Sequence, residues 1–429
     1  MTVSISVSIS GDYAIVGAPY DDDNNDTSGS AYIFKRDGTI WSQQAKIIAS
    51  DGTAWDYFGN SVSISGDYAI VGAFGGDEHD PSGSAYIFKR DGTIWSQQAK
   101  ITPSDGAPGG WFGYSISISG EYAIVGARGG YCGIYPGSTY IYKRNGTMWS
   151  QQAKIAPSDG AAGDLFGISV SISDDYVIAG AIHDGDISDY SGSAYIWRRD
   201  ETTWSQQAKI TPSDGAAYDL FGYPVSISGD YAIVGASGDD ERGDYPGSAY
   251  ILERNGTTWS QQAKINASDG DMFDHFGRTV SISGDYVIAG AYCGDDRGDT
   301  AGSAYIFKHN GTTWNEQAKI IASDGAAYDM FGCSVSVSGN YVIVGAQGDD
   351  DNGNESGSAY IYDIQTSEPP ITGDLNGDGR LTPVDTVTAL KMAAGCCEPT
   401  TSADVNDDGV VNSLDALIIL QAAAGLITL

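Results

Sequence analysis

The chain has 429 residues, enough for two domains, and 41% of them are hydrophobic, so a packed core can form. Its 56 acidic and 22 basic residues give a net charge of −34. Such a surface repels phosphates and makes nucleic acid a poor partner, whereas divalent cations suit it. No hydrophobic run is long enough to cross a bilayer, and the start MTVSISVSIS has no signal-peptide pattern. We therefore expect no membrane insertion, and we find no signal peptide in this chain.

An internal repeat dominates the sequence. The block Gly-Asp-Tyr-x-Ile-x-Gly-Ala recurs seven times with small variations, at a spacing of 54 or 55 residues. The repeated tyrosines are Tyr13, Tyr68, Tyr122, Tyr176, Tyr231, Tyr286 and Tyr341. A period of this length is typical of propellers and other repeat architectures.

The second unit shows which elements each repeat contains. Residues 61–65 alternate apolar and small polar side chains, 68–73 form an apolar run, and 84–89 and 94–101 alternate again. Period-two patterning with β-branched residues predicts four strands. Gly66-Asp67 and Asp91-Gly92 lie where tight hairpin turns are expected.

Seven such units predict a mostly β fold, a seven-bladed β-propeller of four-stranded antiparallel blades over residues 1–363. One sheet cannot bury both of its faces alone, so the blades stack around an axis. The small residues of the first strand suit the crowded centre, and the tryptophan-bearing fourth strand suits the outer edge.

Each unit also has a Phe-Gly pair that leads to the Gly-Ala pair. The clearest are Phe58-Gly59, Phe112-Gly113, Phe166-Gly167, Phe221-Gly222, Phe276-Gly277 and Phe331-Gly332. These units resemble FG-GAP repeats, the units of the integrin α-subunit propeller. The resemblance implies a propeller used for adhesion or ligand binding.

The calcium loop of calcium-binding FG-GAP blades is missing between Phe-Gly and Gly-Ala, so no ion is expected there. Acidic stretches follow Gly-Ala instead, and they either hold further calcium ions or are solvated acidic loops. They are Asp21-Asp22-Asp23, Asp239-Asp240, Asp295-Asp296 and Asp349-Asp350-Asp351.

The fourth strand of the seventh unit is missing. Only six units have the tryptophan strand, and the last unit runs into Pro369-Pro370, which argues against a ladder strand there. An exposed sheet edge recruits other strands. One hypothesis is that another subunit or segment completes this blade and the protein polymerises. The alternative is a tolerated three-stranded blade or a truncated chain.

From residue 373 the pattern changes to two calcium-type loops. Each has Asp-x-Asn-x-Asp-Gly and an aspartate at position twelve, and each leads into an apolar helix, at 385–394 and 415–424. Oxygen ligands at positions 1, 3, 5, 7, 9 and 12 surround calcium in such loops. We therefore predict two calcium ions, with these ligands: Asp374, Asn376, Asp378, Arg380, Thr382, Asp385, Asp404, Asn406, Asp408, Val410, Asn412 and Asp415.

This module resembles type I dockerin repeats, which bind cohesin-like partners and fold with calcium. Positions 10 and 11, where that family recognises its partner, hold Pro383-Val384 and Ser413-Leu414 instead of paired hydroxyls. The partner is therefore a cohesin-like domain or another copy of this protein. The predicted organisation is a propeller at 1–363, a proline-containing linker at 364–372 and the α-helical dockerin-like, EF-hand-type module at 373–429.

Six Asn-x-Ser/Thr sequences are glycosylation candidates. They are Asn25, Asn145, Asn255, Asn266, Asn310 and Asn354. Three of them fall in Asn-Gly turns that a hairpin demands in any case, so glycosylation stays an open alternative. A dockerin-like tail favours a bacterial or archaeal source.

No arrangement of residues points to catalysis, and we expect a protein that is not an enzyme. The first functional hypothesis is an extracellular calcium-binding surface protein for adhesion or protein–protein interaction, with a glycan as a further candidate ligand. The second is a structural subunit of a filament or sheath that assembles through the open seventh blade and the dockerin-like module. A carbohydrate-active enzyme with a dockerin-like tether is a distant third.

Overall fold

The computed structural model describes most of the chain, in two compact units that comprise residues 1–362 and 363–429. The described residues are 6–22, 26–75, 82–106, 110–129, 136–185, 187–239, 246–295, 298–351, 356–364, 375, 383–394, 403, 405 and 410–423.

The first unit consists of strands that follow the repeat. The first strands of the blades are β1 (Val7–Ser10), β5 (Ser61–Ser65), β9 (Phe112–Ser119), β13 (Val170–Ser173), β17 (Val225–Ser228), β21 (Thr279–Ser283) and β25 (Phe331–Ser338). The second strands are β2 (Tyr13–Ala18), β6 (Tyr68–Ala73), β10 (Tyr122–Ala127), β14 (Tyr176–Ala181), β18 (Tyr231–Ala236), β22 (Tyr286–Ala291) and β26 (Tyr341–Ala346).

The third and fourth strands complete the blades. The third strands are β3 (Ser30–Asp37), β7 (Ser84–Asp91), β11 (Ser138–Asn145), β15 (Ser193–Asp200), β19 (Ser248–Asn255), β23 (Ser303–His309) and β27 (Ser358–Asp363). The fourth strands are β4 (Ile40–Ile47), β8 (Ile94–Ile101), β12 (Met148–Ile155), β16 (Thr203–Ile210), β20 (Thr258–Ile265) and β24 (Trp314–Ile320).

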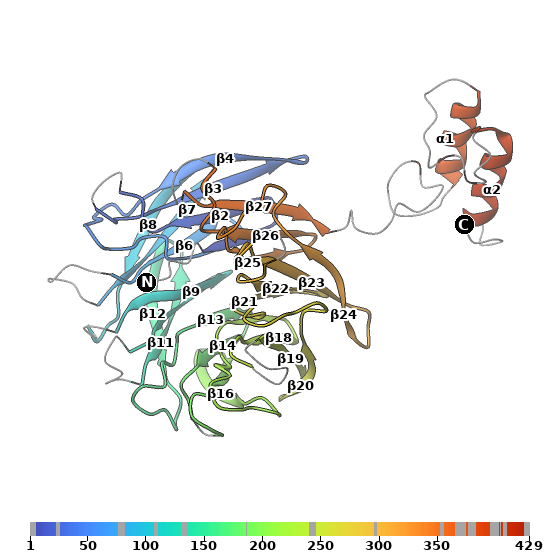
Figure 1. Ribbon diagram of the computed structural model, residues 1–429. Helices are drawn as coiled ribbons and strands as arrows, with labels where there is room; N and C mark the ends of the chain where they lie inside the picture. Colours follow the sequence, from blue (N-terminus) through green and yellow to red (C-terminus); the bar gives the residue numbers. More distant parts are fainter. Residues whose placement is uncertain are drawn as a thin grey trace. The chain divides into compact units, whose positions relative to one another are not determined.

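Seven antiparallel sheets with consecutive strand order form a seven-bladed propeller, as predicted (Figure 1). Blades one to six have four strands each. Among the described residues blade seven has three, in the order β25-β26-β27, so the prediction of a blade without its outer strand is confirmed.

Serines of the first strands join neighbouring blades around the axis. In each blade the first strand would have a free edge, but its backbone N–H groups donate to serine hydroxyls of the preceding blade. Val62 N–H donates to Ser6 Oγ at 3.0 Å, and Val7 N–H donates to Ser334 Oγ at 3.0 Å. The second bond joins blade one to blade seven and closes the ring. The alternation of serine with Val or Ile thus has a physical reason, since buried backbone donors require partners.

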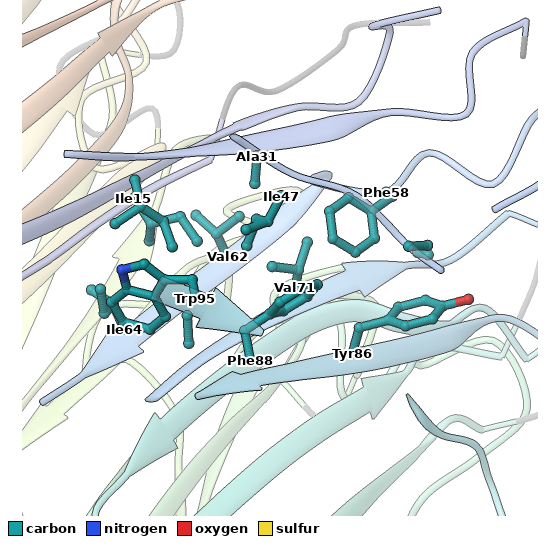
Figure 2. Close-up of a cluster of buried hydrophobic side chains, with 14 residues drawn as sticks. Ile15, Ala31, Ile47, Phe58, Val62, Ile64, Val71, Tyr86, Phe88 and Trp95 are labelled. Carbon is teal, nitrogen blue, oxygen red and sulfur yellow. The ribbon is translucent and has the colours of Figure 1, made fainter. Parts of the chain in front are cut away.

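The hydrophobic core lies between adjacent blades. Figure 2 shows the layer between blades one and two, where Phe58, Tyr86 and Trp95 pack with Val62 and Ile47. The second-strand tyrosine of one blade meets the outer-strand tryptophan of the next edge to face, as in Tyr13–Trp95 at 6.0 Å. Such aromatic pairs contribute about 0.5–1.5 kcal/mol beyond their buried area.

The Phe-Gly and Gly-Ala pairs mark a close approach of two backbones. A Cβ added to Gly17 would lie 1.9 Å from the carbonyl oxygen of Gly59, and Gly59 has a φ of +99°. Only glycine fits both positions without strain. The repeated glycines therefore lie where the backbones of successive blades are in contact.

The second unit contains two short helices, α1 (Pro383–Ala393) and α2 (Ser413–Ala423). Both begin two residues before the predicted starts, because positions 10 and 11 of each loop already form the first turn. Ala389, Ala416 and Ile419 are buried together, with Leu375 and Val405 packed against them. No described helix has the length and apolar character needed to cross a membrane.

Candidate functional site

The twelfth-position aspartates of the two loops are buried at the starts of the helices. Asp385 and Asp415 are 0% exposed. Leu375 N–H donates to Asp385 Oδ1 at 3.0 Å, and Val405 N–H donates to Asp415 Oδ1 at 3.2 Å. In each loop position twelve is therefore bonded to position two, which folds the loop back on itself.

Asn412, at position nine, caps α2. Its side-chain oxygen accepts a hydrogen bond from Leu414 N–H at 2.7 Å, and its own N–H donates to Asp415 Oδ2 at 2.8 Å. Its Nδ2 donates to the carbonyl of Val410 at 3.1 Å. Burial of a carboxylate is costly unless it is paired or binds a metal, so the donor chemistry of these residues fits calcium.

The remaining predicted ligands lie outside the described residues: Asp374, Asn376, Asp378, Arg380, Thr382, Asp404, Asn406 and Asp408. In the part of the chain that is described, no three His, Cys, Asp or Glu side chains converge as a metal site. The calcium ligand set thus stays a prediction. Bound calcium would supply the charge that offsets carboxylates packed in each loop.

The acidic stretches after Gly-Ala have a role that the sequence did not reveal. In three of the four stretches an aspartate accepts a hydrogen bond from the third-strand tyrosine of its blade, namely Asp21, Asp239 and Asp349. Asp21 and Asp239 also pair with a lysine, whereas Asp295 is exposed. In blade five Tyr250 Oη donates to Asp239 and to Asp214, both at 3.0 Å. Lys264 Nζ lies 2.8 Å from Asp239 and 2.7 Å from Asp214, above the Tyr250 ring.

We call this arrangement the lysine cluster, formed by the third-strand tyrosine, the fourth-strand lysine and one or two aspartates. Each of blades one to six has one, with an ion pair to the lysine. The lysines are Lys46, Lys100, Lys154, Lys209, Lys264 and Lys319. The clusters join aspartates of the loops to the strands. In blades one and five, one of these aspartates belongs to an acidic stretch predicted as a candidate cation site, and a lysine of the protein occupies the place of the cation. Their signal was the constant spacing of tyrosine, lysine and Ser-Asp-Gly in the repeat.

A large cavity opens at one mouth of the propeller. It has a volume of about 1210 Å³ and is lined by the starts of the first strands and by loops rich in aromatic residues. We call it the central mouth. Its volume suits a ligand larger than most drug-sized molecules.

Two positions of the repeat line the central mouth and differ between units. One follows Phe-Gly and the other follows Gly-Ala. The cavity-lining residues at the first position are Asn60, Tyr114, Ile168, Tyr223, Arg278 and Cys333. Those at the second are Phe74, Arg128, Tyr292 and Gln347. The propeller therefore presents variable side chains on a frame of repeated glycines.

Two arginines of the central mouth lie against aromatic rings. The guanidinium of Arg128 is 4.1 Å from the ring of Trp111 and 4.3 Å from that of Tyr114, and Arg278 is 4.6 Å from Tyr223. The adjacent Tyr223 and then burial raise the pKa of Tyr114, while both arginines lower it. All four side chains are therefore close enough to interact.

These arginines differ from those of the hairpins. Arg90, Arg199 and their equivalents bind a carboxylate of the preceding turn. Among the described residues no carboxylate forms an ion pair with Arg128 or Arg278. The buried Nε of Arg128 has no hydrogen-bond partner, but neither has that of Arg90 or Arg199, so the missing ion pair is what distinguishes the two groups. Asp164, which also lines the mouth, accepts a hydrogen bond from Ala161 N–H at 2.6 Å.

The predicted glycosylation sites have different surroundings. Asn145, Asn255 and Asn310 are exposed at hairpin turns, whereas Asn266 Nδ2 donates to Ser248 Oγ at 2.6 Å. The other two candidates, Asn25 and Asn354, lie outside the described residues.

Comparison with known proteins agrees with the repeat. The FG-GAP repeat model matches residues 4–34, 41–88, 95–142, 149–197, 204–252, 259–307 and 314–362, and the dockerin type I domain model matches 372–423. No curated protein matches the chain. Among solved structures it is similar to Saccharomyces cerevisiae Sqt1, at 11% identity and a TM-score of 0.46, over 86% of this chain and 84% of that chain. The chain thus belongs to the FG-GAP repeat family and carries a C-terminal type I dockerin domain.

Proposed function

We propose that the protein is an extracellular, non-catalytic adhesion protein whose central mouth binds an acidic glycan and whose dockerin domain attaches it to another protein. The observation that carries the proposal is the pair Arg128 and Arg278, which have no carboxylate partner among the described residues, in a protein of net charge −34. A carboxylate of the ligand would occupy the place that acidic residues take at the hairpin arginines. Arginine binds carboxylates through two parallel hydrogen bonds, which adds specificity.

Aromatic side chains favour a sugar over a small inorganic anion. Trp55 is 51% exposed and Tyr190 is 43% exposed at the rim, and Tyr57 stacks on Phe74 with ring centroids 5.2 Å apart. Exposed aromatic faces in a cleft offer stacking surface that has no role in the core. A chain of uronic acid residues supplies both flat apolar faces and carboxylates.

The scarcity of carboxylates among the described residues of the mouth supports a role in binding rather than hydrolysis. Glycosidases generally use two carboxyl groups that flank the scissile bond. Among the described cavity-lining residues Asp164 is the single carboxylate, and it is engaged by its own loop. The dockerin domain supports a protein partner of the cohesin type, with another copy of this chain as the second candidate.

Titration calorimetry with a galacturonate oligosaccharide tests the ligand, with the neutral galactose oligosaccharide of the same length as the control. We expect binding of the acidic form alone. The double variant Arg128→Ala, Arg278→Ala should weaken it by at least about tenfold, since each arginine gives a charge-assisted contact. Arg144→Ala, at a paired hairpin arginine, should leave the affinity unchanged. Equal binding of both sugars, or of both variants, would refute the proposal.

A structural role in a filament is the second candidate, and the open edge of blade seven favours it. Electron microscopy of the full chain in calcium and in chelator tests it. Regular polymers that disperse in chelator would support assembly. A monomer in both conditions would contradict the filament role, and ligand binding would be the remaining candidate function.

A further inference from the structure

The open edge of blade seven retains the groups that bind an outer strand in every other blade. In blades one to six the fourth strand runs antiparallel to the third, and its lysine lies directly opposite the third-strand tyrosine. Examples are Tyr195 with Lys209 and Tyr250 with Lys264. The equivalent tyrosine of blade seven is Tyr360, on β27.

The lysine cluster of blade seven has its aspartates and its tyrosine but no lysine among the described residues. Tyr360 Oη lies 2.7 Å from Asp349 Oδ2 and 2.8 Å from Asp324 Oδ1. Asp349 is 3% exposed, like Asp239 of blade five. One hydroxyl proton cannot serve two carboxylates at once, so the pair of negative charges is complementary to a cation.

The tyrosine of the preceding blade provides a second point of contact. Six outer-strand tryptophans pack against six second-strand tyrosines around the ring, including Trp314 on Tyr231 and Trp41 on Tyr341. The remaining second-strand tyrosine is Tyr286, in blade six, and no described tryptophan contacts its ring. By the order of the ring, the tryptophan that belongs on Tyr286 is that of an outer strand in blade seven.

A third point of contact lies in blade one. Outer-strand tryptophans donate their indole N–H to a glutamine of the preceding outer strand. The bonds are Trp95 to Gln44, Trp149 to Gln98, Trp204 to Gln152, Trp259 to Gln207 and Trp314 to Gln262, at 2.7–3.1 Å. Trp41 has no such partner in the described part of the chain, and the strand that would provide it belongs to blade seven.

Among the described residues, no strand pairs with the outer edge of β27, and its apolar side chains are less buried than their counterparts. The third-strand isoleucine is 0–3% exposed in the other six blades, but Ile361 is partly exposed. Ala359 is exposed, whereas Ala85 and its counterparts are buried. The N–H and C=O groups that face outward from β27 are a template for a further strand.

We propose that the edge of β27 is a specific docking site for one extended polypeptide segment with the pattern Trp-x-x-Gln-x-Lys-Ile. The lysine enters the carboxylate pair, and the tryptophan covers Tyr286. The glutamine, three residues after the tryptophan in the same strand, accepts the indole N–H of Trp41. The spacing of these three residues within one strand follows from the six strands already in place. All six copies of the pattern in the sequence lie in blades one to six, so the occupant is a further segment of this kind.

This inference is independent of the ligand proposed for the central mouth, because the two sites share no residue. A fluorescent peptide with the sequence of residues 202–213, which includes β16, is the probe. Its affinity for the full chain is measured by fluorescence anisotropy. We expect saturable one-to-one binding, and we expect the peptide with Lys209→Glu to bind more weakly by at least about tenfold, because it would place a third negative charge in the cluster.

A matched pair of protein variants locates the site. Asp349→Asn should weaken binding of the unmodified peptide, whereas Asp184→Asn, at the same position of the completed blade four, should not. Thermal unfolding checks that both protein variants fold. If Asp349→Asn does not fold, the comparison of the two peptides on the unmodified protein still tests the proposal. No binding, equal affinity of the two peptides, or equal effects of the two protein variants would overturn the proposal. So would dimers that join β27 to β27 and exclude the peptide.

Discussion

Removal of the lysine from a complete lysine cluster tests whether these clusters stabilise the propeller. In blade five the Lys264 side chain is 17% exposed, and those of Asp239 and Asp214 are 4% and 27% exposed. Lys264→Met keeps an unbranched apolar side chain of similar volume beside the Tyr250 ring and removes the ammonium group. The substitution leaves a nearly buried carboxylate without its cation.

The expected cost can be derived from burial and geometry. Removal of one partner from a buried ion pair destabilises a protein by about 3–5 kcal/mol, whereas an exposed pair contributes about 0–1 kcal/mol. The pair of Lys264 with Asp239 is a buried ion pair, and its pair with Asp214 is partly exposed. We therefore expect Lys264→Met to lower the free energy of unfolding by about 3 kcal/mol.

Guanidinium unfolding followed by tryptophan fluorescence measures this cost, provided that the slope of the transition is unchanged. Lys89→Met is the matched control, since Lys89 lies on the third strand of blade two outside its cluster. A cost for Lys264→Met within about 0.5 kcal/mol of that control would refute the structural role. The acidic stretches would then have to be read as solvated loops or cation sites.

Three further outcomes follow from the described geometry. Asp415→Ala should abolish the protection against proteolysis that calcium gives the dockerin domain, measured on the full chain with and without chelator, because position twelve closes the second loop. The hydrogen bond from Lys154 holds the pKa of Asp105 below the ordinary 3.8, so its contribution to stability is present above pH 3.8 and is lost as the pH falls through the folded-state pKa. Between pH 5 and the acid range, the unfolding midpoint of Lys154→Met should therefore fall less steeply with decreasing pH than that of the unmodified protein. In a glycosylating host, peptide mass spectrometry should find a glycan on the exposed Asn255 and none on Asn266, whose amide nitrogen is already bonded.

The blades could be predicted from the sequence because the evidence for them is local and repeated. Residues 61–65, 68–73 and 94–101 form strands with the predicted bounds, and only the third strand is longer, ending at Asp91. Alternation within a strand and glycine at a turn depend on near neighbours. The lysine clusters were missed because Asp214 and Lys264 are 50 positions apart, and only the closed blade brings them together.

The central mouth could not be predicted for a different reason, and this reason supports the proposal for its function. The residues that hold the ring together recur in nearly every unit, and this recurrence makes the fold visible in the sequence. Tyr114, Tyr223 and Arg278 occupy one position of the repeat where the units disagree, so no common pattern draws attention to them. Disagreement between units is the expected property of a ligand site on a repeated frame, because a single ligand breaks the symmetry of the ring that binds it. In a propeller of this kind the repeated residues indicate the fold, and the departures from the repeat indicate where to look for the ligand.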